Sequence, residues 1–329
     1  MKVLTLDHDQ VAALLTMGDC IAVMERCLLD VAEGAIHNPL RTIVRPPGAS
    51  GLLGLMPAYL GGDDPVFGVK TVCVFPGNPA IGLDAHQGAV LLFSGETGEL
   101  LAVMNASAIT AIRTAAVSAV ATRALARAGS RRLAIVGAGV QARTHLAAMA
   151  EVLPLERVRI SGRDPARVKR LVEGATVDVG FQVEAAGSVE EAVRDADVVV
   201  TVTSSPHPVI ERRWIAPGTH LNAVGSSIPT AREIDGPTMA AARLFVDRRE
   251  STVNESGDYL MAVAEGAIPG PGHIVAELGD VLAGRAEGRR SAEEITLFKS
   301  LGLAAEDLAS ARHLLRAARE AGAGTWVDV

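Results

Sequence analysis

The second half of the chain alternates short apolar runs with segments of helical pattern. The apolar runs cover residues 133–136, 158–160, 181–185, 197–203, 220–224 and 244–247. Continuous apolar strands separated by helices are typical of a parallel sheet that is covered by helices on both faces. The pattern therefore predicts a doubly wound, Rossmann-type α/β domain.

The first part of the chain follows a different pattern. Residues 19–33 carry apolar side chains at helical spacing, which predicts an amphipathic helix. Strand-like runs follow at 52–56, 67–75, 89–93 and 100–104. The last two runs flank a turn at 95–98 and predict an antiparallel hairpin. The alanine-rich residues 107–128 end at Gly129 and predict one long helix, so this part is expected to be an α+β domain.

The end of the chain has a less regular pattern. After Asn254 the sequence reads as loop-rich, and residues 291–320 read as terminal helices. The segment at 298–315 could return to the first domain. A chain of 329 residues has the length expected for two domains.

Composition narrows the class of partner. The chain is 49% hydrophobic and 21% charged, so each domain can bury a core without disulfides or metal ions. A net charge of −7 lacks the electrostatic footprint expected for binding nucleic acid or an anionic membrane. We therefore expect a small-molecule partner.

The cysteines and the first residues indicate the compartment. Cys20, Cys27 and Cys73 form an odd set without CxxC spacing, which we interpret as core residues in a reducing compartment. The first ten residues lack the basic start and apolar stretch of a signal peptide, and no run of about 18 apolar residues occurs. We expect a cytoplasmic protein that spans no membrane.

The apolar run at 133–136 leads directly into a glycine-rich turn. Gly137, Gly139 and Ala142 have the spacing GxGxxA, and an apolar helix follows. Glycines let the backbone turn and approach a pyrophosphate at the helix N-terminus, and a small third residue permits close packing of strand and helix. The alternative is a tight strand-to-helix turn without a ligand. The strand, the helix and the alternating pattern around the motif favour a nicotinamide dinucleotide site.

The end of the second strand bears on which dinucleotide is bound. NAD-binding proteins often have an acidic residue here for the ribose hydroxyls, whereas this chain has Ser161 and Arg163. Arg163 could pair with a 2′-phosphate and Ser161 could donate a hydrogen bond, which favours NADP(H), with NAD(H) as the alternative. The structural alternatives are a solvated loop residue for Arg163 and a helix N-cap for Asp164, which precedes Pro165.

Two basic residues stand in apolar settings. Strand alternation puts Lys70 on the same face as Val72 and Val74, so it either escapes at a sheet edge or is held inward to bind an anion or move a proton. Arg113 interrupts a helix of small residues, where the structural explanation is a salt bridge or an interface contact. Each residue alone leaves these alternatives open.

Several stretches together resemble one known family. They are LRTIV, GLMPAYL, FGVKTV, HQGAVLLFSGETGELLAVMN, ITAIRTAAVSAVAT, GAGVQA, THLNAVGSS and LFKSLGLAAEDL. In this order, and over nearly the whole chain, they resemble the ornithine cyclodeaminase and mu-crystallin family. The resemblance implies a homodimer with a substrate-binding and dimerisation domain at 1–114 and 297–329. It also implies an NAD(P)-binding Rossmann domain at 115–296, with the active site between the domains.

The resemblance also implies roles for single residues. By position, Arg41, Lys70 and Arg113 look like the family's cluster for the substrate carboxylate, since convergent cations orient a carboxylate by charge-assisted hydrogen bonds. Met56 and His86 fall near the same pocket, with a packed methionine and a structural histidine as the alternatives. The residues that look like cofactor neighbours are Thr114, Gly137, Gly139, Val140, Gln141, Ser161, Arg163, Thr203, Val224 and Ser300.

Three positions depart from the cyclodeaminase pattern. Ser227 stands where cyclodeaminases carry an Asp, and Gly54 where they carry an acidic residue. Asn105 stands where many relatives have an Asp. A serine hydroxyl supplies neither a carboxylate's charge nor a comparable base. Ser227, which we place with Lys70 and Arg113 in the predicted catalytic set, resembles the mu-crystallin branch of NADPH-dependent ketimine reductases, and so does Arg163.

The resemblance therefore points to reduction of a cyclic ketimine carboxylate, such as a pyrroline or piperideine 2-carboxylate, by NADPH in imino acid metabolism. Lys70 is the predicted proton-handling group, with a bound water as the alternative. Other functions stay open: an amino acid dehydrogenase, an ornithine cyclodeaminase that recycles NAD, and an NADPH-loaded binding protein without turnover. No metal ion is expected.

Overall fold

The chain divides into two compact units in the computed structural model, which describes residues 2–175 and 180–329. Unit 1 is formed by residues 1–113 and 302–329, and unit 2 by residues 114–301. The expected boundary at residue 297 is wrong in detail. It falls inside strand β15 (Thr296–Lys299), which pairs with two strands of the unit 2 sheet.

Unit 2 is built on a sheet in which all the described strand pairs are parallel. In spatial order its strands are β10 (Gln182–Ala185), β9 (Arg157–Ser161), β8 (Arg132–Val136), β11 (Val198–Thr201), β12 (His220–Ala223), β15, β13 (Arg243–Val246) and β14 (Ile274–Glu277). From β8 the strand order runs outward through β9 and β10 on one side and through β11 and β12 on the other, as in a Rossmann-type fold.

Both faces of this sheet are buried. Leu133 and Ile135 of β8 belong to one apolar cluster, and Ala134 and Val136 belong to another on the opposite face. The covering helices are α4 (Val140–Val152), α5 (Pro165–Ala175), α6 (Val189–Val193), α7 (Gly236–Ala241), α8 (Arg249–Glu255), α9 (Gly257–Ala264) and α10 (Leu278–Leu282), with short 3-10 turns at Arg212–Trp214 and Pro271–His273. The doubly wound α/β prediction is confirmed.

The prediction for the C-terminal part of this unit is wrong. The region after Asn254 is not loop-rich, because it contains α9, β14 and α10. Residues 291–320 are not all helical, because β15 occupies Thr296–Lys299 before the last helix begins at Ala304. β15 lies between β12 and β13, so its place depends on pairing with segments far away in the sequence.

Unit 1 contains a mixed sheet. In spatial order its strands are β16 (Thr325–Asp328), β1 (Lys2–Leu6), β7 (Leu100–Asn105), β6 (His86–Ser94), β5 (Val66–Val74), β4 (Leu52–Leu60) and β2 (Ile36–His37), with β3 (Thr42–Val44) also paired to β4. Its helices are α1 (His8–Leu14), α2 (Met17–Ala32), α11 (Ala304–Ala321) and the 3-10 turn Asn78–Ile81. The predicted hairpin is confirmed as β6 and β7, and the predicted amphipathic helix as α2, which Thr16 caps.

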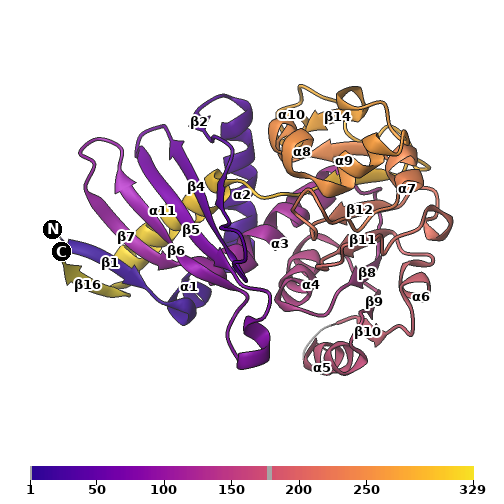
Figure 1. Cartoon of the computed structure of the whole chain (residues 1–329), viewed down its shortest axis with the longest axis horizontal. Helices are drawn as coiled ribbons and strands as arrows, with labels where there is room; N and C mark the ends of the chain where they lie inside the picture. Colours follow the sequence, from indigo (N-terminus) through magenta and orange to yellow (C-terminus); the bar gives the residue numbers. More distant parts are fainter. Residues whose placement is uncertain (1, 176–179) are drawn as a thin grey trace. The chain divides into compact units, whose positions relative to one another are not determined.

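One face of the unit 1 sheet is covered by helices, and the other is not. α11 packs on β4, β5 and β6 and also contacts α2, so it lies across the middle of the sheet (Figure 1). Side chains on the opposite face of the strands are only partly buried, and Phe67 is 51% exposed. We call this second surface the outer sheet face.

Helix α3 (Ala106–Leu125) carries the chain from unit 1 into unit 2. Asn105 caps it, since Asn105 Oδ1 accepts a hydrogen bond of 2.9 Å from the backbone N–H of Ala108. Among the described residues α3 alone is long and apolar enough to cross a membrane, but 78% of its most apolar window is buried. Such burial, together with the buried Arg113, is typical of a core helix.

Candidate active site

Lys70 lies in the interior of unit 1. β5 is flanked by β4 and β6, and Lys70 is in register with Met56 on one side and Val90 on the other. The side chain is 3% exposed and faces the helix-covered side of the sheet. The alternative in which Lys70 escapes at a sheet edge is therefore wrong, and its ammonium needs a partner inside the unit.

Two acidic residues at the start of α11 provide that partner. Lys70 Nζ lies 3.0 Å from Asp307 Oδ1, and Arg113 Nε lies 3.1 Å from the same oxygen. Arg113 Nη1 is also 2.6 Å from Glu306 Oε2. All four side chains are buried. The salt-bridge explanation for Arg113 is thus correct, and the sequence reading did not single out Glu306 or Asp307.

Arg41 joins the same group of charges. Arg41 Nη2 donates a hydrogen bond of 2.9 Å to the carbonyl oxygen of Gly302. Arg113 lies against the same glycine, where a Cβ atom would come within 2.6 Å of Arg113 Nη1. The three predicted carboxylate-binding cations therefore gather around the turn that leads into α11. We call Arg41, Lys70, Arg113, Glu306 and Asp307 the charge cluster.

The charge cluster sets the protonation of Lys70. Burial, together with the positive charges of Arg113 and Arg41, lowers the pKa of Lys70 to about 8, and the nearby Asp307 carboxylate opposes part of that shift. A lysine with a pKa near 8 is mostly charged at neutral pH and can still release a proton, which suits a group that holds an anion and handles a proton.

The two other predicted substrate neighbours differ in exposure. Met56 is buried beside Lys70 on the neighbouring strand. His86 begins β6 and is exposed, and its backbone carbonyl accepts a hydrogen bond from Ser107 Oγ. Their roles stay predictions.

The glycine-rich turn in unit 2 has the geometry of a phosphate-binding loop. β8 ends at Val136, and Gly139 is the N-cap of α4. Gly137 has a φ of +130°, a value that favours glycine, and a Cβ there would lie 2.7 Å from the carbonyl oxygen of Val202. A Cβ at Gly139 would meet no atom within 4 Å, so there is open space at the helix N-terminus. Backbone N–H groups of a first helical turn have no intrahelical acceptor and favour an anion, so this loop fits a pyrophosphate.

Replacing Gly137 with alanine is expected to weaken binding of the dinucleotide about tenfold. The positive φ and the contact with Val202 would each cost about 1 kcal/mol or more and would displace the loop. Titration of NADPH fluorescence measures the change. Gly174→Ala in α5, where a Cβ meets no atom within 4 Å, is the control, and equal affinity in both variants would contradict the assignment of the loop.

The other predicted cofactor residues occupy strand ends or helix starts of unit 2. Ser161, Thr203, Val224 and Ser300 lie at or just after the ends of β9, β11, β12 and β15, and Thr114, Val140 and Gln141 lie on α3 and α4. Ligands of doubly wound sheets bind at the carboxyl ends of the strands. These contacts stay predictions.

Arg163 and Ser227 are exposed. Arg163 follows β9, where a ribose phosphate is recognised in Rossmann folds. The cap interpretation of Asp164 is correct, because its Oδ1 accepts hydrogen bonds from the N–H groups of Ala166 and Arg167. Ser227 lies on the loop after β12, and its predicted catalytic role stays a prediction.

A second buried group of charges supports the loops after β11 and β12. Lys299 Nζ lies 2.8 Å from Asp258 Oδ2 and donates a hydrogen bond of 2.8 Å to the carbonyl oxygen of Gly225. Lys299 and Asp258 are both fully buried. The pair therefore fixes the backbone just beyond Val224.

Glu233 completes this group. Its carboxylate accepts hydrogen bonds of 2.7 Å from Thr201 Oγ1 and 2.6 Å from the N–H of Thr203. The N–H of Glu233 itself donates to Asp258 Oδ1 at 2.7 Å. Burial raises the pKa of Glu233, and the charge of Lys299 opposes the shift. The sequence reading did not identify these residues.

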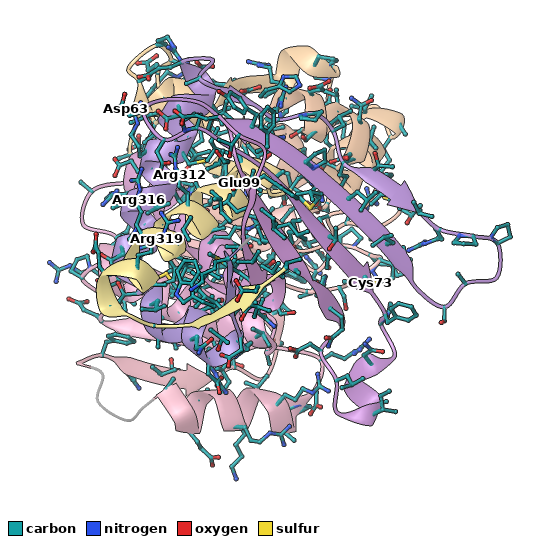
Figure 2. The ribbon with its side chains drawn as sticks, turned by 90° about the vertical axis from the view of Figure 1, so that its left-hand side faces the viewer. Asp63, Cys73, Glu99, Arg312, Arg316 and Arg319 are labelled. Atoms are coloured by element: carbon teal, nitrogen blue, oxygen red, sulfur yellow. The ribbon has the colours of Figure 1, made fainter. Side chains whose placement is uncertain are left out.

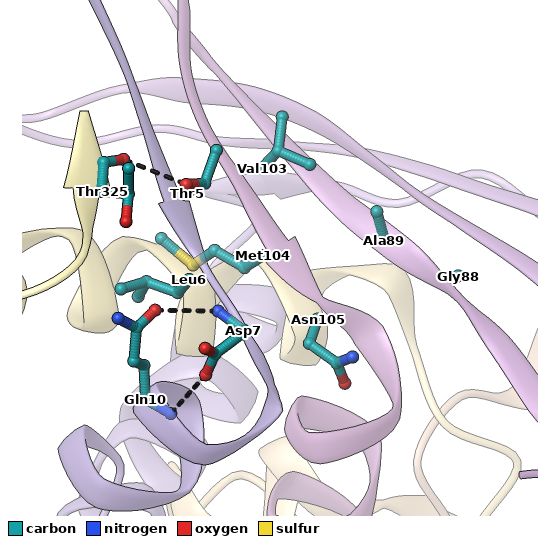
Figure 3. A pocket seen from close by; sticks show the side chains of 10 residues that line it. All are labelled: Thr5, Leu6, Asp7, Gln10, Gly88, Ala89, Val103, Met104, Asn105 and Thr325. Carbon is teal, nitrogen blue, oxygen red and sulfur yellow. Dashed lines mark hydrogen bonds between the residues drawn. The ribbon is translucent and has the colours of Figure 1, made fainter. Parts of the chain in front are cut away.

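Two cavities in unit 1 lie elsewhere. A cavity of about 320 Å³ is lined by Asp7, Gln10 and Asn105, among others, and its polar groups cap α1 and α3 (Figure 3). A cavity of about 260 Å³ borders α11, where Arg312 and Arg316 follow one another along the helix (Figure 2). Arg316 is paired with Asp64 at 2.9 Å. Neither cavity is lined by a predicted site residue.

Comparison with known proteins identifies the family. The family model "Ornithine cyclodeaminase/mu-crystallin family" matches residues 1–322. The chain belongs to this family. The ketimine reductase mu-crystallin of Mus musculus is 41% identical over 280 residues, which cover 85% of each chain.

Solved structures of similar proteins have the same fold over nearly the whole chain. The Thermococcus litoralis Δ1-pyrroline-2-carboxylate reductase, in complex with NADH and L-proline, has a TM-score of 0.95 and 39% identity and covers 99% of this chain and 100% of that one. An archaeal alanine dehydrogenase dimer with bound NAD has a TM-score of 0.94 and 34% identity, with 100% and 99% covered. This member of the ornithine cyclodeaminase/mu-crystallin family is an NAD(P)H-dependent oxidoreductase.

Proposed function

We propose that this chain is an NADPH-dependent reductase of cyclic ketimine carboxylates, with Δ1-pyrroline-2-carboxylate and Δ1-piperideine-2-carboxylate as the substrate class. The observation that carries the proposal is the gathering of Arg41, Lys70 and Arg113 around one turn of unit 1. Two relatives of this chain are named as reductases of ketimines or of pyrroline-2-carboxylate.

The chain's own residues have distinct tasks in this reaction. When bound, the reduced nicotinamide supplies the hydride that reduces the C=N carbon. Gly137, Gly139 and the first turn of α4 would hold its pyrophosphate. Arg41 and Arg113 orient the substrate carboxylate by charge-assisted hydrogen bonds. Lys70 Nζ holds the proton that the product nitrogen gains.

A set of four assays tests the proposal. NADPH absorbance is followed with pyrroline-2-carboxylate, with piperideine-2-carboxylate and with pyruvate plus ammonia, and ornithine is tested for ammonia release. We expect oxidation of NADPH with one or both cyclic ketimines. Turnover confined to pyruvate plus ammonia would instead show an amino acid dehydrogenase, and ammonia from ornithine a cyclodeaminase. NADPH binding without turnover in any assay would show a binding protein.

Replacing Arg163 with alanine is expected to raise KM for NADPH about tenfold and to leave KM for NADH unchanged. The exposed guanidinium after β9 would lose a charge-assisted contact with the 2′-phosphate, which is worth about 1.5–3 kcal/mol. Initial rates with both cofactors measure the ratio. Arg167→Ala, an exposed arginine in α5, is the control, and an equal change for both cofactors would refute the NADP(H) preference.

The same proposal includes a homodimer in the cytoplasm. Tyr59 and Phe67 pack on the outer sheet face with ring centroids 4.7 Å apart, and Val69, Leu91 and Val103 continue this apolar surface. A contiguous apolar surface on a folded chain favours association. The archaeal relative described as a dimer favours a second copy as the partner.

Replacing Phe67 with glutamate is expected to convert the dimer into a monomer. A charged side chain at the centre of the outer sheet face would be desolvated without a partner when the surfaces meet. Sedimentation equilibrium measures the mass. Val263→Glu, which changes a partly exposed valine of unit 2, is the matched control. A dimer that persists in Phe67→Glu would contradict this interface.

A further inference from the structure

Asp307 holds two cations through one atom. Lys70 Nζ and Arg113 Nε approach the same carboxylate oxygen, Oδ1, at 3.0 and 3.1 Å. Asp307 is fully buried. Its second oxygen, Oδ2, is buried and accepts no hydrogen bond from the described residues. A buried carboxylate normally uses both oxygens, so Oδ2 leaves a place for a donor that a water or a ligand brings.

Several charged or titratable groups surround Lys70. Asp307 on α11, Arg113 on α3, Arg41 before β3 and His86 on β6 are the charged or titratable groups that act on Lys70 or feel its charge. Glu306 and the thiol of Cys20 border Arg113, and burial raises the pKa of Cys20 to about 12, so that this thiol is neutral. With His86 neutral, Asp307 is the anion that faces the Lys70 ammonium directly.

We propose that Asp307 is a positioning residue of the reductase: it fixes the Lys70 ammonium and the Arg113 guanidinium at one point and keeps Lys70 charged for the substrate carboxylate. This inference rests on the proposed function and assigns a role to a residue outside the predicted substrate and cofactor contacts. Glu306 also helps to position Arg113, because its Oε2 accepts a hydrogen bond of 2.6 Å from Arg113 Nη1.

The groups around Lys70 shift its pKa in opposite directions. Burial favours the neutral amine, and the Asp307 carboxylate opposes it by Coulomb attraction and by a hydrogen bond. Removing the carboxylate therefore lets the pKa of Lys70 fall further. Arg41 repels the ammonium, so removing its charge lets the pKa of Lys70 rise. A residue with only a structural role would produce neither displacement.

The test is the pH dependence of kcat/KM with pyrroline-2-carboxylate and saturating NADPH. The wild type should lose activity above about pH 8, where Lys70 becomes neutral. We call this loss of activity at high pH the alkaline limb of the pH profile. In Asp307→Asn the alkaline limb should move about 1–3 pH units toward acid, since an opposite charge at this distance shifts a pKa by that amount. In Arg41→Gln it should move toward higher pH. The substrate's own titration is common to all variants.

Asp64→Asn is the matched control, because it neutralises an exposed, paired aspartate of the same unit and should leave the limb in place. An alkaline limb that stays in place in Asp307→Asn would overturn the inference. If Asp307→Asn does not fold, Asp307→Glu decides: it keeps the charge but displaces the carboxylate, so kcat/KM should fall about tenfold or more, and an unchanged kcat/KM in that variant would overturn the inference. An inactive, folded wild type would count against the proposed function instead.

Discussion

Replacing Lys299 with methionine should lower the free energy of unfolding of unit 2 by about 3–5 kcal/mol, because it leaves the buried Asp258 carboxylate without its cation. Methionine has a similar volume, so the loss would come from charge and hydrogen bonding rather than from a cavity. The loops after β11 and β12 should also loosen, and KM for NADPH should rise. The variant therefore tests stability and cofactor binding together.

The two tryptophans allow unit 2 to be followed by itself. Trp214 lies in unit 2 and Trp326 in unit 1, so Trp214 fluorescence in a Trp326→Phe background reports urea unfolding of unit 2. Lys169→Met, an exposed lysine of α5, should change the free energy of unfolding by less than about 0.5 kcal/mol. Adding Asp258→Asn to Lys299→Met should recover part of the loss. Additive losses in the double variant would contradict a coupled pair.

Acid should destabilise unit 2 well before its carboxylates are protonated. Burial lowers the pKa of His145 to about 4, and burial with the charge of Arg289 lowers that of His220 to about 3. Both are neutral in the folded chain and become protonated near pH 6.5 when it unfolds. Their contribution to stability is complete above pH 6.5 and is lost as the pH falls toward their folded pKa values. Between pH 6.5 and 4.5 the two histidines together should lower the free energy of unfolding by about 4 kcal/mol.

Glu233 opposes this trend, because its raised pKa means that the folded chain gains a proton first as the pH falls. His145→Gln isolates the effect of one histidine. In this variant the slope of the free energy of unfolding against pH, measured by urea titration, should decrease by about 1.4 kcal/mol per pH unit below pH 6. His207→Gln, at an exposed position, should leave the slope unchanged. An unchanged slope in His145→Gln would show that His145 is already charged in the folded chain.

The correct predictions rest on local sequence patterns. The strands of unit 2 before residue 250 are read directly from apolar runs, because strands buried on both faces consist mostly of apolar residues. The turn at Gly137 and Gly139 is also local, since its backbone geometry follows from the absence of side chains. The hairpin of β6 and β7 likewise depends on neighbouring residues.

The missed elements depend on partners far away in the sequence. β15 contains Thr296 and Lys299, which look like helix or loop residues until β12 and β13 enclose them and Asp258 pairs with the lysine. Glu306 and Asp307 have an ordinary local explanation, because acidic residues are common in the first turn of a helix. The sequence left open whether Lys70 escapes at a sheet edge or is held inward, and the spacing of residues could not say which carboxylate pairs with it inside unit 1.

Unit 1 is interrupted by the whole of unit 2, and this arrangement imposes an order on biosynthesis. Lys70 leaves the ribosome 237 residues ahead of the aspartate that neutralises it. Unit 2 is complete in sequence at residue 301 and can fold first, while the nascent first 113 residues still lack α11 and β16. A premature stop codon after residue 301 would therefore leave an intact Rossmann domain attached to a sheet with unbalanced internal cations, a product that quality-control proteases should remove.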